Sequence, residues 1–215
     1  MSGRPTRETL FIDGPVGRLE AIVETPAGDS LAGAAVVCHP HPQHGGTMHN
    51  KVAHTLARAF NDCQLAAVRF NYRGVEASDG EYDDGIGEVA DALAVVEWTR
   101  SRFDDPALWF GGFSFGAAMA IRGSFDAQPD GLVSIAPAVA RFANELPSQP
   151  TCSWLIVHGD RDELVPVDET VEWVDSLSPG PELLVMQGAD HFFHGRLVEL
   201  RAHIVEFIAR ARAAS

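Results

Sequence analysis

The chain has 215 residues, of which 46% are apolar and 21% charged, and its formal net charge is −14. This ordinary globular balance suits a single domain over residues 1–215, in which folding buries about 70% of the unfolded surface. Because so acidic a chain repels phosphate backbones and anionic lipid, we expect neither nucleic acid nor membrane as a partner. We also expect no signal peptide and no membrane-spanning segment.

The three cysteines, Cys38, Cys63 and Cys152, are an odd and widely spaced set. Their spacing matches neither a disulfide framework nor a zinc finger, and it suits a reducing compartment. The sequence therefore predicts a cytoplasmic protein without disulfides.

Strand-like runs recur along the whole chain. Two of them flank residues 13–17 and predict a hairpin, and later runs are short and apolar throughout, as expected for strands covered on both faces. We predict eight strands: 9–13, 18–24, 34–38, 65–70, the run beginning at Leu108, 132–136, 153–158 and 182–187.

Helical patterns separate most of these runs. Thr47 is a suitable N-cap for a helix to Cys63, and Asp168 is one for a helix to about Leu177. The remaining helices are an amphipathic segment from Ile86 to Phe103, an Ala-rich segment after Ser114, and a closing helix with Leu197, Leu200, Ile204, Phe207 and Ile208 on one face. Alternating strands and helices predict a mostly parallel sheet with helices on both faces.

A strand, a sharp turn and a helix meet at Gly112-Phe-Ser114-Phe-Gly116. A residue raised above a sheet edge in this way needs a strained backbone that brings the strand and the helix close together. Side chains at positions 112 and 116 would then collide, so both positions require Gly. Ser114 at a helix N-terminus, where negative charge is favoured, is therefore a candidate nucleophile.

Two further loops follow predicted strands and carry the partners that such a serine needs. Asp160 and Asp162 lie after the strand 153–158, and His191 and His194 lie after the last strand. The loops that follow parallel strands meet at one edge of the sheet, and the order nucleophile, acid, base is that of α/β-hydrolases. The residues alone favour Asp162 over Asp160, which suits a turn, and they leave both histidines open.

An oxyanion hole needs two backbone N–H groups, one after the nucleophile and one after an early strand. Phe115 supplies the first. In the loop after strand 34–38, Pro40 and Pro42 have no N–H, so His41 is the donor between them, and Gln43 would require a longer reach. We therefore predict an oxyanion hole formed by Phe115 and His41.

The segment 39–54 is rich in histidine, which raises the alternative of a metal site. Zinc prefers a tetrahedral set on defined elements, whereas here two prolines interrupt the loop and one histidine falls on the polar face of a helix. We expect no metal and no cofactor, and we expect Arg73 to be a structural loop arginine. The histidines concerned are His39, His41, His44, His49 and His54.

Three longer motifs carry a family resemblance. Residues 39–51 read His-Pro-x-x-x-x-Gly-Gly-x-Met-x-Asn-Lys, residues 69–74 read Arg-Phe-Asn-Tyr-Arg-Gly, and residues 188–194 read Gly-x-x-His-Phe-Phe-His. Over nearly its whole length the chain resembles the α/β-hydrolase superfamily, and within it the small lidless bacterial hydrolases related to dienelactone hydrolase. The resemblance implies the α/β-hydrolase fold, with a sheet of about eight strands and minimal or no lid.

The resemblance also bears on the site. It implies that His191 is the base, and the match of residues 159–166 to Gly-x-x-Asp-x-x-Val-Pro implies that Asp162 is the acid. Two departures stand out. Glu76 occupies a position where such loops more often have Gly, which affects the pocket rim, and Ser114 stands where dienelactone hydrolases proper use Cys.

These features predict a serine hydrolase, specifically a carboxylesterase that cleaves small esters or thioesters through an acyl-enzyme. Residues 139–151 leave room for little more than a turn or short helix, so we expect an open pocket. Either the loop 71–85, with its two tyrosines, or a partner subunit in a homodimer could add a wall. One alternative is a peptidase or amidase, because the same triad suits amides. Another is a non-catalytic binding protein of this fold, although the chain retains every triad member and both elbow glycines.

Overall fold

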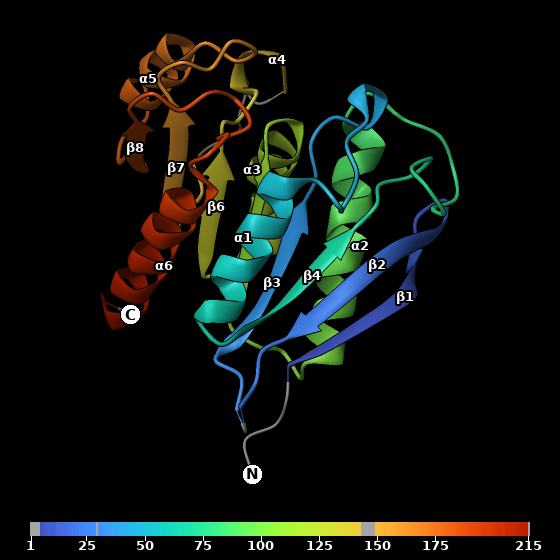
Figure 1. Ribbon diagram of the computed structural model, residues 1–215. Helices are drawn as coiled ribbons and strands as arrows, with labels where there is room; N and C mark the ends of the chain where they lie inside the picture. The colour runs from blue at the N-terminus through green and yellow to red at the C-terminus, as the bar shows by residue number, and fades with distance from the viewer. Residues whose placement is uncertain (1–4, 29, 143–148, 215) are drawn as a thin grey trace.

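A computed structural model of the chain describes residues 5–28, 30–142 and 149–214. In these residues a single eight-stranded sheet has the order β1-β2-β4-β3-β5-β6-β7-β8 (Figure 1). The β1–β2 and β2–β4 pairs are antiparallel, and the other five pairs are parallel. The strands are β1 (Thr6–Gly14), β2 (Gly17–Thr25), β3 (Gly33–Cys38), β4 (Leu65–Phe70), β5 (Leu108–Phe113), β6 (Gly131–Ile135), β7 (Ser153–Gly159) and β8 (Glu182–Met186).

Helices cover both faces of the sheet. One face carries α1 and α6, which pack against each other, and the opposite face carries α2 and α3 (Figure 1). The predicted mostly parallel α/β sheet is therefore confirmed. The helices are α1 (Lys51–Asp62), α2 (Ile86–Arg102), α3 (Phe115–Ala127), α4 (Val139–Phe142), α5 (Val167–Asp175) and α6 (Leu197–Ala214), with a 3₁₀ turn at Pro42–His44.

The central strand β3 explains why its sequence is apolar throughout. Successive side chains of a strand point to opposite faces of the sheet. Val36 and Cys38 accordingly lie in the core under α2 and α3, while Ala35 and Val37 lie in the core under α1 and α6. Both faces are buried, so no position of this strand tolerates a polar side chain at low cost.

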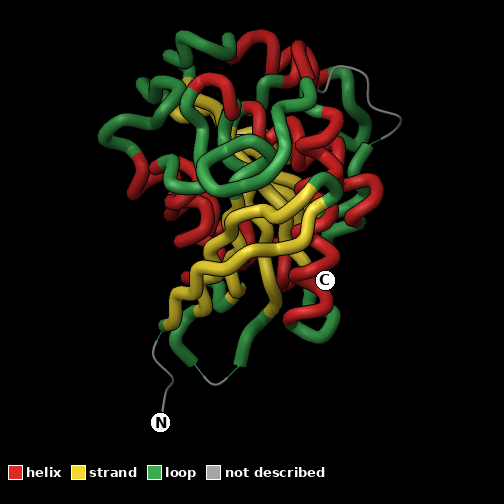
Figure 2. Tube along the Cα trace, turned by 90° about the vertical axis from the view of Figure 1, so that its right-hand side faces the viewer, coloured by secondary structure: helices red, strands yellow, loops and turns green. Residues whose placement is uncertain are grey.

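The topology places the functional loops at one end of the sheet. The parallel strands run in the same direction, and the arrowheads of β3, β6 and β7 all point toward the upper end in Figure 1. The loops that follow their carboxyl ends therefore gather there. Figure 2 shows the molecule from the β1 edge, with the long twisted hairpin of β1 and β2 facing the viewer.

The predicted start of α1 is wrong by three residues. Asn50, not Thr47, is the N-cap, and its Oδ1 accepts hydrogen bonds from the N–H groups of Val52 (2.9 Å) and Ala53 (3.3 Å). Thr47 instead accepts one from the His49 N–H. Both Thr and Asn are good caps, and the sequence alone does not show which of them precedes the first helical turn.

Three further expectations need correction. The helix α5 begins at Val167 after Pro166, so Asp168 lies in its first turn and is not the cap. Ile86 is 68% exposed, and the buried face of α2 instead includes Glu88 and Asp91. The polar composition of residues 1–7 predicts a frayed end, but β1 already begins at Thr6, and residues 1–4 lie outside the described part.

The predicted irregular stretch 139–151 begins with the short helix α4, and its residues 143–148 lie outside the described part. The cysteines Cys38, Cys63 and Cys152 are free, Cys38 being buried and the other two partly buried. Within the described ranges, no helix is both long and apolar enough to cross a membrane.

Candidate active site

The site is built around Ser114, which lies between β5 and α3. Its backbone has φ 55° and ψ −116°, a conformation that is costly for a residue with a Cβ, and its N–H donates to the Ile135 carbonyl (2.8 Å). A Cβ on Gly112 would lie 2.8 Å from the Ala117 nitrogen, and one on Gly116 would lie 2.6 Å from the Cys38 carbonyl carbon. Gly112 is therefore required by the close approach of strand and helix, as the sequence predicts, whereas Gly116 is required by the loop after β3.

His191 and Asp162 form a hydrogen-bonded pair beside this turn. The Nδ1 atom of His191 lies 2.6 Å from Asp162 Oδ2, although the two residues come from different loops. The imidazole is buried and packs against the rings of Phe113 and Phe192, with centroids 4.9 and 5.1 Å away. These contacts fix the ring plane, so that Nε2 is the nitrogen left for a reacting group.

Asp162 is held by more than His191. Its Oδ1 accepts hydrogen bonds from the N–H groups of Leu164 (2.9 Å) and Val165 (2.8 Å), and His158 Nε2 lies 3.3 Å from its Oδ2. Burial raises the pKa of Asp162, but contacts with His158, His191 and the Val165 N–H outweigh it, so this pKa lies well below its ordinary value. Asp162 is therefore ionised at neutral pH.

His158 was not singled out by the sequence analysis. It is the penultimate residue of β7, is fully buried, and its Nε2 also lies 2.9 Å from the Val165 carbonyl oxygen. Its place four residues before Asp162, at the carboxyl end of a buried strand, is the signal in the sequence that could have indicated it.

The alternative residues lie apart from this pair. Asp160 accepts a hydrogen bond from the Gly188 N–H (2.5 Å) and so joins the two loops. His194 has a side chain that is 73% exposed, and its Nδ1 lies 2.7 Å from Asp190 Oδ2. The structure therefore brings together Asp162 and His191 and leaves Asp160 and His194 in other contacts.

A cavity of about 290 Å³ opens in front of Ser114. Its wall includes the elbow serine, the His191 ring and the His41 side chain, together with Phe142 and Leu164. In the described residues no hydrogen bond joins Ser114 Oγ to His191. Hydrogen bonds of this kind often tighten only when substrate binds, and the shared cavity places both groups within reach of one ligand.

The two predicted oxyanion donors flank the elbow. Phe115 is the first residue of α3, where backbone N–H groups have no partner within the helix. No acceptor for the His41 N–H occurs in the described residues. The His41 ring packs against the Phe115 ring, with centroids 4.8 Å apart, and both residues line the cavity.

The His41 side chain is itself held in place. Its Nδ1 accepts from the Gln43 N–H (3.2 Å), so the proton lies on Nε2, which is 3.3 Å from the Tyr82 hydroxyl. Burial lowers the pKa of His41. Tyr82 belongs to the 71–85 loop, so this loop supports the part of the cavity that His41 lines.

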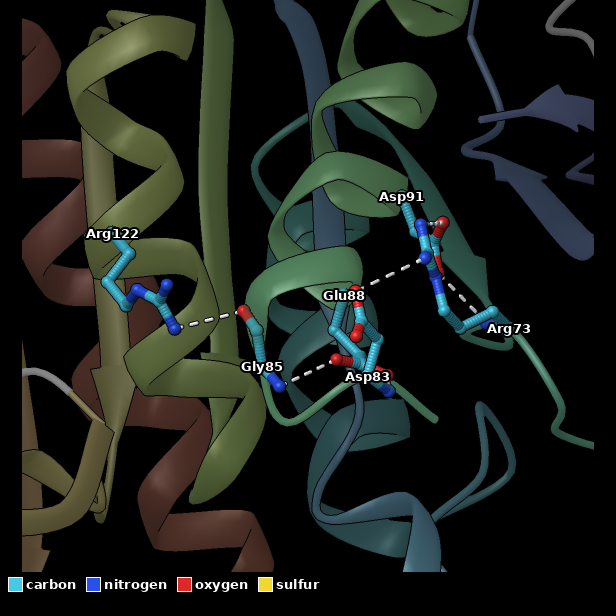
Figure 3. Close-up of polar contacts among 6 residues, drawn as sticks. All are labelled: Arg73, Asp83, Gly85, Glu88, Asp91 and Arg122. Atoms are coloured by element: carbon cyan, nitrogen blue, oxygen red, sulfur yellow. Dashed lines mark hydrogen bonds and ion pairs between the residues drawn. The ribbon is translucent and has the colours of Figure 1, made fainter. Parts of the chain in front are cut away.

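Buried charges fix the 71–85 loop against α2 and α3 (Figure 3). Arg73 pairs with Asp91 through two side-chain nitrogens (2.9 and 2.7 Å), while Glu88 accepts from the N–H groups of Asp83 and Gly85. In addition, Arg122 donates to the Gly85 carbonyl (2.9 Å). Arg73 is therefore structural, as the sequence predicts, and its partner is one of the carboxylates on the buried face of α2.

Glu76, the departure noted in the same loop, has φ 50°. This left-handed region favours glycine, which explains why related loops more often have Gly there.

The comparisons with known proteins agree with this geometry. No protein-family model matches the chain. An α/β serine hydrolase without a lid from Xanthomonas campestris is 39% identical and superimposes with a TM-score of 0.90, covering 95% of this chain and 94% of its own. An α/β serine hydrolase homologue from Coxiella burnetii is 45% identical, with a TM-score of 0.88 and coverage of 93% and 96%. An uncharacterized protein of Rickettsia prowazekii is 31% identical over 218 residues, or 93% of this chain and 87% of its own.

The fold and these relatives define an α/β hydrolase. More narrowly, the chain belongs to the family of α/β serine hydrolases without a lid, and the resemblance drawn from its motifs is confirmed.

Proposed function

We propose that this hydrolase is a carboxylesterase that cleaves small esters or thioesters through an acyl-enzyme on Ser114. The observation that carries the proposal is the 2.6 Å contact between His191 and ionised Asp162 at the same cavity as a strained elbow serine. A serine hydroxyl is a weak nucleophile at its own pKa and needs an adjacent base. Such an array at a pocket of ligand size serves acyl transfer.

In the proposed reaction, His191 Nε2 takes the proton of Ser114 as its Oγ attacks the ester carbonyl carbon. Asp162 holds the other ring nitrogen and stabilises the imidazolium that forms. The Phe115 and His41 N–H groups bind the oxyanion. His191 then gives the proton to the leaving alkoxide or thiolate, and a water molecule activated in the same way releases the acid.

Hydrolysis of p-nitrophenyl acetate tests the proposal. We expect turnover by the wild type and a loss of at least about 1,000-fold in Ser114→Ala, because the triad acts as a unit. Ser124→Ala is the matched control, since this serine lies in the same helix α3 and its hydroxyl donates to the Ile121 carbonyl. Equal turnover by wild type and Ser114→Ala would refute the proposal. Parallel assays with a p-nitroanilide distinguish an amidase from an esterase.

A further inference from the structure

His39 has a defined tautomer, and this decides what it can do. It follows β3 directly and is fully buried. Its Nε2 accepts a hydrogen bond from the backbone N–H of Tyr72 (3.2 Å), and an amide N–H can only donate. The ring proton therefore lies on Nδ1, which donates to the Pro40 carbonyl at 2.6 Å. Burial lowers the pKa of His39 to about 3, so the ring is neutral at ordinary pH.

The Pro40 carbonyl belongs to the same peptide unit as the His41 N–H. In a planar trans peptide the C=O and N–H groups point in opposite directions. In the described residues the only cis bond is Ser178–Pro179, so the Pro40–His41 peptide is trans. A hydrogen bond that fixes the direction of the Pro40 oxygen therefore also fixes the direction of the His41 N–H.

We propose that His39 is a positioning residue of the oxyanion hole, which turns the Pro40–His41 peptide so that its N–H faces the cavity. This inference rests on the proposed ester hydrolysis. His39 does not touch the substrate, and it acts only through the peptide that follows it. The backbone of Gly46 lies against the Pro40 oxygen on a second side, so close that a Cβ added to Gly46 would overlap this oxygen.

The Nε2 atom of His39 links the Pro40–His41 peptide to the 71–85 loop. Tyr72 packs its ring edge-on against His39, with centroids 4.6 Å apart, and its backbone N–H is the donor to Nε2. The next residue, Arg73, is held by the buried carboxylate of Asp91. The 71–85 loop, fixed by the contacts in Figure 3, therefore anchors His39.

Two amide substitutions separate the functions of the two ring nitrogens. The amide nitrogen of Asn lies near the position of Nδ1, so His39→Asn keeps a donor for the Pro40 carbonyl and loses the acceptor for Tyr72. The longer side chain of Gln reaches the Nε2 position, so His39→Gln keeps that acceptor and loses the donor. Each variant therefore removes one buried hydrogen bond, and we expect similar losses in Tm.

We expect kcat for p-nitrophenyl acetate to fall less than about 10-fold in His39→Asn and about 100-fold or more in His39→Gln, with KM little changed in both. The loss of about 100-fold in His39→Gln is what the removal of one oxyanion donor typically costs in kcat. A purely structural role would make kcat follow Tm, with both variants equally impaired. That result, or higher kcat in His39→Gln than in His39→Asn, would overturn the proposal.

The rate of Ser114 labelling by a fluorophosphonate is the second readout, because its phosphonyl oxygen uses the same hole without ester turnover. We expect the order wild type, His39→Asn, His39→Gln, from fastest to slowest. A wild type that is labelled but cleaves no ester contradicts the proposed function alone, and the labelling order still decides the role of His39. A wild type that is not labelled contradicts both.

Discussion

Gly116→Ala tests how closely the turn at Ser114 and the loop after β3 approach each other. The added Cβ would lie 2.6 Å from the Cys38 carbonyl carbon and would overlap the carbonyl oxygen of His39. Carbon atoms pack at about 3.5–4.0 Å, so the start of α3 and the loop must separate by about 1 Å. All of these neighbours are backbone atoms, which cannot turn away as a side chain can.

A displacement of about 1 Å in a site costs about 100-fold in rate, or about 2.7 kcal/mol of transition-state stabilisation. Overpacking lowers the free energy of unfolding by about 1–3 kcal/mol. The higher helix propensity of Ala offsets up to about 1 kcal/mol of this loss. We therefore expect kcat/KM of Gly116→Ala to fall about 100-fold while the protein remains folded at 25 °C. The measurements are p-nitrophenyl acetate kinetics and thermal unfolding.

Gly123→Ala is the matched control, since it makes the same change in the same helix. Its Cβ would meet the edge of the Phe110 ring at 3.2 Å, and a side chain can shift by a few tenths of an ångström. We expect activity within about 3-fold of the wild type. If Gly116→Ala is as active as Gly123→Ala, the close approach of loop and elbow does not shape the site, and our explanation of the second elbow glycine is wrong.

Four further predictions follow from the same geometry. Asp162→Asn should lose on the order of 1,000-fold or more in kcat, whereas Asp160→Asn, which alters only a loop contact, should stay near wild type; the reverse ranking would move the acid to Asp160. His191→Ala should be inactive and His194→Ala active, and an inactive His194→Ala would reassign the base. Among p-nitrophenyl esters, kcat/KM should peak at or below butyrate, because a cavity of about 290 Å³ leaves longer chains in water; a profile still rising at octanoate would contradict this. The folded-state pKa of His39, about 3, lies below its unfolded value, so protonation favours unfolding and stability should decrease as pH falls below about 6.5, by up to about 1.4 kcal/mol per pH unit. Urea unfolding of His39→Asn should lack this contribution, and an unchanged pH slope would show that His39 is not held neutral.

Much of the fold could be predicted from the sequence because short apolar runs and glycine-rich turns report local requirements. The strand Leu65–Phe70 was predicted with its observed bounds, and the two elbow glycines were predicted from the collision that their side chains would cause. For the strand and for Gly112 a single element or turn determines the residue types, whereas the neighbours of Gly116 belong to the loop after β3.

The errors arise where a tertiary contact overrides the local pattern. The apolar pattern of α2 begins at Ile86, but this side chain is exposed and the helix turns Glu88 and Asp91 inward instead. The two carboxylates are satisfied there by Arg73 and by the backbone of the 71–85 loop. Nothing within the helical segment itself indicates those partners. The N-cap Asn50 was missed for a different reason, since the nearby Thr47 is also a favourable N-cap residue.

In the site, too, local patterns were predictable from the sequence and tertiary contacts were not. Motif and spacing indicated Ser114, Asp162 and His191, while the contact of His39 with Tyr72 joins residues 33 apart and became visible only in the structure. His158 was likewise missed, because its proximity to Asp162 depends on how the loop after β7 folds back.

Covalent labelling tests the central claim most directly. The wild type is treated with a fluorophosphonate, its intact mass is measured, and the modified peptide is sequenced by mass spectrometry. We predict one adduct, located on Ser114, with labelling abolished in Ser114→Ala and strongly slowed in His191→Ala. No adduct, or an adduct on another residue with Ser114 unmodified, would contradict the assignment of Ser114 as the nucleophile.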